Sequence, residues 1–298
     1  MNKGDIMFKL NKFEKFVIRH YSAMVVAYFV IITALMVIND IFEGIFFTIP
    51  LLLMIVAYFG GLFVITIPSR KIKQINEFSN VALDINHALD ACNQIIEATN
   101  QKSTKFLPSY CIYRIICLIN IGDFDRAENE IRLFWQHFNL KKVVTSDLAT
   151  THILMANIAL EKGNIQLFNE EMRIVDEYRS DSKLFGIFKR LYNYNLTDIT
   201  LYAEAYFANE NSNAQDFEAR VFAHMSLDET TGKKRKKNKE PSPMVYFSAY
   251  NRLFIFYKNQ GDSVKATYYA QQLVNIGNEQ LSDYRKAKEY LENENSSN

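Results

Sequence analysis

Two long apolar runs without a single charge lie near the start of the chain and set its first seventy residues apart from the rest. The first extends from Tyr21 to Ile38 and the second from Ile45 to Pro68. As helices they would be about 27 Å and about 36 Å long, compared with a hydrocarbon core of about 30 Å. Only Asn39 to Gly44 separates them. We therefore expect a two-helix transmembrane hairpin within residues 1–70, with spans at about 21–38 and 45–68.

The charges that flank these runs predict the orientation of the hairpin. Basic residues cluster outside both runs, whereas the short connection carries Asp40 and Glu43 and no basic residue. Because Lys and Arg favour the cytoplasmic side, both termini are expected in the cytoplasm, in a cell (plasma) membrane of the bacterial type. A cleaved signal peptide fits poorly, since no small-residue cleavage site follows Ile38. A buried hairpin of a soluble protein is the other alternative. The flanking basic residues are Lys3, Lys9, Lys12, Lys15 and Arg19 before the runs, and Arg70, Lys71 and Lys73 after them.

The pattern then changes to apolar residues in steps of three and four, which indicates amphipathic helices. The first of these extends from Ile72 to Ile96. Further apolar stripes recur throughout residues 71–298, and the whole chain has only 10 Gly and 5 Pro. Long periodic segments with so few helix breakers predict an all-α protein. We expect residues 71–298 to form a cytosolic helical domain.

The sequence predicts that this domain consists of helix pairs, each joined by a turn that contains a glycine. Gly122 ends one apolar stripe where a left-handed residue is needed, and glycine adopts that conformation at least cost. Asp123 can cap the next helix. Ala127 is small, as a residue must be where two helices cross closely. The segment therefore predicts an αα-hairpin.

This unit recurs along the chain. Gly163 lies between two further helical stripes, and Gly261, Asp262 and Ala266 repeat the first turn most clearly. A diverged unit fits between them, at residues 202–225. Helix pairs that recur at this spacing predict an α-solenoid.

The runs G-D-F-D-R-A at 122–127 and G-D-S-V-K-A at 261–266 resemble the turn of the tetratricopeptide repeat. The resemblance implies helix pairs that stack into a right-handed superhelix, whose concave face holds a peptide or protein segment. Asn157 and Asn251 fall at its ligand-clamp positions. The set of basic and amide side chains with which the family binds C-terminal carboxylates is missing. Binding of a C-terminal carboxylate is therefore not expected.

Composition and motifs narrow the functional classes. A net charge of +1 argues against a protein that coats nucleic acid. Three cysteines are too few for a disulfide framework. We find no phosphate-binding loop, zinc motif or nucleophile elbow, and expect no enzyme activity, cofactor or metal.

Two local features offer alternatives. Trp135 is either a core residue or an anchor in the groove. Residues 228–242 are expected to form a disordered basic loop that contacts anionic lipid, contacts nucleic acid or serves as a linker. In a membrane-tethered domain, contact with anionic lipid is favoured over contact with nucleic acid. The basic residues of this loop are Lys233, Lys234, Arg235, Lys236, Lys237 and Lys239.

Together these features predict a membrane-anchored adaptor or assembly factor that holds a protein or peptide partner. Confinement to the membrane would raise the effective concentration of whatever the groove holds. The alternatives are a membrane-bound enzyme, which converging acid, base and nucleophile side chains would favour, and a small regulatory or defence component that acts through the hairpin.

Overall fold

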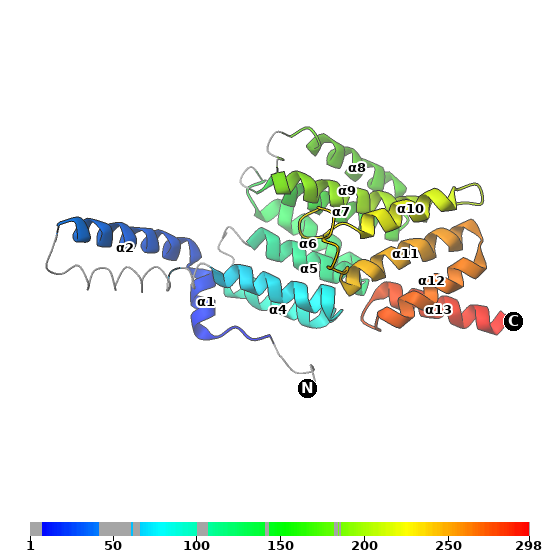
Figure 1. Cartoon of the computed structure of the whole chain (residues 1–298), viewed down its shortest axis with the longest axis horizontal. Coiled ribbons are helices and arrows are strands. Elements are labelled where there is room, and N and C mark those ends of the chain that lie inside the picture. Colours follow the sequence, from blue (N-terminus) through cyan, green and yellow to red (C-terminus); the bar gives the residue numbers. More distant parts are fainter. Residues whose placement is uncertain are drawn as a thin grey trace.

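A computed structural model describes residues 8–41, 61, 66–99, 107–140, 143–181, 184 and 186–297. Within these residues the regular structure is helical, and one isolated bridge between Leu227 and Lys234 is the sole β pairing. The all-α prediction is therefore confirmed (Figure 1). Residues 66–76 are also helical. The labelled elements are α1 (Lys12–Arg19), α2 (Tyr21–Ile41), the π-turn η1 (Glu77–Val81), α4 (Ile85–Ala98), α5 (Leu107–Ile121), α6 (Phe124–His137), α7 (Thr145–Glu161), α8 (Ile165–Tyr178), α9 (Gly186–Tyr206), α10 (Ala214–Met225), α11 (Pro243–Gln260), α12 (Ser263–Ile276) and α13 (Ser282–Ser297).

The apolar helix α2 projects away from the other helices (Figure 1). In the described residues, no single helix combines the length and apolar character needed to cross a membrane. The pair α1 and α2, bent by 85°, meets that criterion only when both helices are counted together. Of the second expected span, 45–68, all but Gly61 and residues 66–68 lie outside the described residues.

The short helix α1 is fastened to the body of the molecule. It begins at a capping box formed by Asn11 and Glu14, and its buried residues are Val17 and Ile18. The Gln94 amide on α4 donates to the carbonyl of Phe8 at 3.0 Å. Glu14 also pairs with Lys71 at 2.8 Å. Packing and polar contacts therefore fix the helix from which α2 departs.

The expected helix pairs are present, and their turns have the conformation that the sequence predicts. Gly122, Gly163 and Gly261 have φ of +81°, +69° and +86°. The residue after each glycine, Asp123, Asn164 and Asp262 in turn, caps the following helix by accepting a backbone N–H three residues on. Ala127 and Ala266 are completely buried at the helix crossings. The pairs are α5–α6, α7–α8 and α11–α12, while α9–α10 has a polar turn capped by Asn213.

The last helices return to the first ones, so the array closes on itself. Arg285 at the start of α13 donates to the carbonyl of Ile121 at the end of α5, at 2.8 Å. Asn278 donates to the carbonyl of Leu83 at 2.9 Å. Buried residues of α4, α11 and α12 belong to one shared core. An open solenoid would leave these surfaces apart, and the closure encloses space between the helices.

The expectation of a disordered loop at 228–242 is wrong. Asp228 is buried, accepts from the backbone N–H of Thr230 at 3.0 Å and pairs with Lys239 at 2.5 Å. Burial alone would raise the pKa of Asp228, but the hydrogen bonds from Lys239 and Thr230 outweigh it and lower that pKa. Arg235 turns inward to pair with Glu229. Acidic side chains at the start of the loop thus offset the repulsion that the basic run implies.

Replacing Gly122 with Ala should destabilise the chain more than replacing Gly261 with Ala. Both have a left-handed backbone, which costs an L-residue about 1–2 kcal/mol. A Cβ at Gly122 would also lie 2.9 Å from Ser282 Cβ, whereas nothing lies within 4 Å of one at Gly261. Denaturant unfolding followed by circular dichroism measures both losses. Gly261→Asn should lose less, because Asn tolerates this conformation; equal losses at 122 and 261 would argue against the packing of α13 on this turn.

Removing Asp228 should open the basic loop. In Asp228→Ala, Lys239 and the Thr230 N–H lose their acceptor. We expect trypsin to cleave at the lysines of 233–239 about tenfold faster, which corresponds to about 1.4 kcal/mol. Glu240→Ala, at an exposed neighbour, is the matched control. Equal cleavage rates in both variants and the parent chain would show that Asp228 does not order the loop.

Candidate binding cavity

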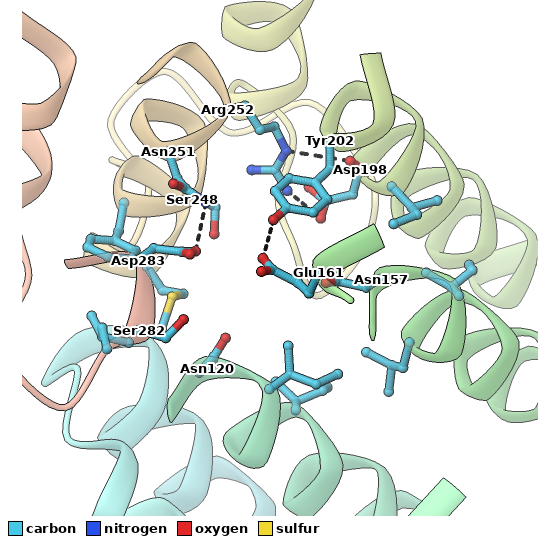
Figure 2. A pocket seen from close by; sticks show the side chains of 18 of the residues that line it. Asn120, Asn157, Glu161, Asp198, Tyr202, Ser248, Asn251, Arg252, Ser282 and Asp283 are labelled. Atoms are coloured by element: carbon cyan, nitrogen blue, oxygen red, sulfur yellow. Dashed lines mark hydrogen bonds and ion pairs between the residues drawn. The ribbon is translucent and has the colours of Figure 1, made fainter. Parts of the chain in front are cut away.

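A cavity of about 260 Å³ lies between the first helices of the pairs. Its lining comes mainly from α5, α7, α9 and α11, with α13 closing one side (Figure 2). The tetratricopeptide resemblance implies a binding face formed by this same set of first helices. Here α13 closes one side of that face.

Asparagines from four successive first helices line this cavity: Asn120, Asn157, Asn195 and Asn251. Asn251 donates to Asp283 at 2.7 Å, and Asn195 donates to a threonine hydroxyl of α7 at 3.4 Å. Within the described part of the chain, the side-chain amides of Asn120 and Asn157 have no hydrogen-bond partner. Figure 2 shows both amides on the cavity side of their helices. A primary amide both donates and accepts, as a peptide bond does.

An ion pair between α9 and α11 forms one wall of the cavity. Arg252 contacts Asp198 at 2.6 Å (Figure 2). The Nε2 atom of His224 lies 3.0 Å from the other carboxylate oxygen. Burial alone would raise the pKa of Asp198, but the charge of Arg252 and the hydrogen bond from His224 outweigh it, so that its pKa is lowered. The carboxylate therefore stays ionised and its partners are held in place.

A second charged cluster lies where α13 meets α7 and α9. Lys286 bridges Glu161 at 2.8 Å and Asp283 at 3.1 Å, and Tyr202 donates to Glu161. Burial raises the pKa of Asp283, which Lys286 offsets only in part. Burial alone would lower the pKa of Lys286, but the two carboxylates raise it. The cluster links the closing helix to the cavity wall.

A smaller recess of about 130 Å³ adjoins this cavity and shares Asp198 and Arg252 with it. It also contains His224 and Ser242. Their Nδ1 and Oγ atoms are buried and have no hydrogen-bond partner within the described residues. Sequence reasoning missed this site, because its residues lie far apart along the chain and match no motif.

Asp198, His224 and Ser242 are the residue types of a hydrolase triad. However, no hydrogen bond joins His224 to Ser242 in the described structure, and Asp198 is also held by Arg252. A nucleophile and its base need such contact to transfer a proton. The described contacts therefore lack the hydrogen bond from Ser242 to His224 that such a triad uses.

The other predicted residues lie away from the cavity. Trp135 donates to the Thr151 hydroxyl at 2.9 Å and stacks on His152 at 4.7 Å between ring centroids. It does not line the cavity, which agrees with the core interpretation. His152 in turn contacts Glu171 at 2.6 Å.

The six basic residues of the loop do not form one uniform surface. Arg235 is paired internally and Lys239 contacts Asp228, which leaves Lys233, Lys234, Lys236 and Lys237 exposed. The loop lies on the body of helices rather than beside α1 and α2 (Figure 1). Lipid contact stays a prediction for the exposed lysines alone.

Comparison of the chain with protein-family models, with curated proteins and with solved structures finds no match in any of the three. The tetratricopeptide resemblance therefore rests on the turn residues. Any assignment of function rests on the cavity, its adjoining recess and the apolar N-terminal helix.

Arg252→Met should destabilise the fold by leaving Asp198 without its cation. Breaking a fully buried pair costs about 3–5 kcal/mol; because the Asp198 side chain is 38% exposed, we expect about 2 kcal/mol after solvent screening. Adding Asp198→Asn should recover part of the loss, since the amide oxygen still accepts from His224. Chemical unfolding of both variants measures their free energies of unfolding. Arg220→Met, on a surface pair, is the control, and a double variant less stable than Arg252→Met would contradict the explanation.

Proposed function

We propose that this chain is a membrane-anchored cytosolic adaptor or assembly factor that holds a short segment of a partner protein in the cavity between α5, α7, α9 and α11. The observation that carries the proposal is the pair of unpartnered amides, Asn120 and Asn157, on neighbouring cavity helices. An extended segment presents backbone N–H and C=O groups that need partners when buried. Side-chain amides supply both kinds of partner without regard to sequence.

The size and lining of the main cavity define the kind of partner segment that it can hold. Contacts from α13 cap one side of the cavity, and its volume is about 260 Å³. A long amphipathic helix would need an open apolar groove. The charged walls around Asp198 and Lys286 are already paired among themselves. A short, extended and largely neutral segment therefore fits best.

The N-terminal helix supports attachment to a membrane. Val26, Phe29 and Val30 of α2 expose 60–62% of their surface, which in water would be a costly apolar patch. A Cβ at Gly61 would overlap the ring of Tyr28, so Gly61 lies close against α2. Small residues allow such close helix crossings within membranes. These observations support the proposed hairpin, and the basic residues that flank it support cytoplasmic termini.

The bend between the first two helices agrees with this placement. With α2 across a bilayer, an angle of 85° would lay α1 along the membrane surface. Phe13 and Phe16 of α1 are about half exposed, and Lys12 and Lys15 lie in the same helix. Exposed aromatic and basic residues are typical of a helix at the lipid interface.

A photocrosslinking residue at Asn157 tests the proposal in intact cells. We expect one discrete crosslinked partner protein, recovered with the membrane fraction, because this position faces the cavity. The same residue at Val264, which is 79% exposed on α12, is the control and should give no such product. Deleting residues 1–70 should release the chain from the membrane. Identical products from both positions, or none from Asn157, would argue against a binding cavity; retention of the truncated chain on membranes would argue against the anchor.

A further inference from the structure

The recess beside the cavity contains two buried polar atoms that lack partners. They are His224 Nδ1, from α10, and Ser242 Oγ, from the start of α11. Leaving a buried donor or acceptor unpaired costs about 1–3 kcal/mol. Unsatisfied groups of this kind are uncommon in folded proteins and need an explanation. Because His224 and Ser242 both line one recess of about 130 Å³, they indicate a site for a ligand that pairs with both atoms.

The environment of His224 decides what its free nitrogen can do. The side chain is 7% exposed, and the ring packs on Tyr194 with centroids 4.3 Å apart. Nε2 lies 3.0 Å from an ionised carboxylate oxygen of Asp198, which can only accept, so Nε2 carries the proton. In a neutral imidazole whose Nε2 carries the proton, Nδ1 is a hydrogen-bond acceptor.

Ser242 is free to donate or accept because it does not cap its own helix. It stands at the N-cap of α11 with extended backbone, yet its side chain makes no capping hydrogen bond. Its carbonyl instead accepts the N–H of Val245 at 3.0 Å. Pro243 follows directly and has no N–H to offer. The hydroxyl therefore remains available to a ligand in the recess.

The carboxylates and the guanidinium that line the recess are already paired, Asp198 with Arg252 and Glu229 with Arg235. The other lining residues are polar Asn80, Tyr194 and Ser248 and apolar Leu201, Val221, Met225, Met244, Val245 and Ala249. A carboxylate has no proton to donate to His224 Nδ1, and an ion loses solvation when it enters the recess. A neutral group with one donor and one acceptor satisfies both polar atoms at once.

We propose that this recess is a side pocket that receives a neutral side chain of the bound segment, a hydroxyl or primary carboxamide as in Ser, Thr, Asn or Gln. The ligand N–H or O–H donates to His224 Nδ1, and its oxygen accepts from Ser242. The recess shares Met244, Ser248 and the Asp198–Arg252 pair with the main cavity. It thus provides side-chain selection next to the amides that bind the backbone. This inference rests on the proposed function.

Acetamide is a suitable probe because it has the donor and the acceptor of the proposed side chain and little else. We would record imidazole ¹⁵N signals of the full chain labelled at histidine, and assign His224 with His224→Phe. Acetamide should shift the Nδ1 signal saturably, and equal concentrations of acetate should not. Ser242→Ala should weaken acetamide binding about tenfold, whereas the remote Ser263→Ala should not. An absent shift, an equal effect of acetate, or an unchanged affinity in Ser242→Ala would overturn the proposal.

Selection of random peptides on the full chain separates this inference from the proposed function. Peptides selected by the parent chain should have Ser, Thr, Asn or Gln at one fixed position, and Ser242→Ala should lose that preference while still selecting peptides. If peptides bind without such a preference and acetamide has no effect, the side-pocket proposal is wrong and the proposal that the main cavity holds a peptide segment stands. If acetamide binds at His224 and no peptide is selected, the proposed ligand site in the recess stands, and the proposal that the main cavity holds a protein segment is wrong.

Discussion

The return of α13 to the first helices is the constraint on which the rest of the site depends. Arg285 binds the carbonyl at the end of α5, and Lys286 reaches Glu161 on α7. Without these contacts the first helices would border an open face, and Glu161 would lose its cation. The close approach of Ser282 to Gly122 shows why that turn has no room for a side chain. One terminal helix therefore determines both the shape of the cavity and the balance of its charges.

Local features of this fold could be predicted from the sequence, whereas features that depend on distant pairs could not. The left-handed glycines and the caps at Asp123 and Asp262 each involve residues within one turn of helix, so the local pattern suffices. Of the cavity, Asn157 and Asn251 were predicted by family resemblance, while the pairing of Asp198 with His224 joins residues 26 apart and has no local signal. The order of the basic loop does not follow from its lysines alone, because it depends on Asp228 and Glu229 pairing with Lys239 and Arg235.

The cavity has the character of a preformed site. Its charged side chains are paired with each other, and the Asp198–Arg252 pair lines both the main cavity and the recess. A binding site whose walls are already ordered loses less conformational entropy when a ligand enters. The few unpaired polar atoms in the described walls are the positions at which the proposed partner segment would gain hydrogen bonds.

The attachment of α1 to α4 has a consequence for how a partner reaches the cavity. A flexible linker would let the helical body swivel and sample every height above a bilayer. The Gln94 and Lys71 contacts prevent this, because they join the elbow at the base of α2 to the body. With α2 across a bilayer, the body would rotate about the axis of α2 at a constant height. A membrane-bound partner would then reach the cavity only if its segment begins at a matching distance from its own last membrane span.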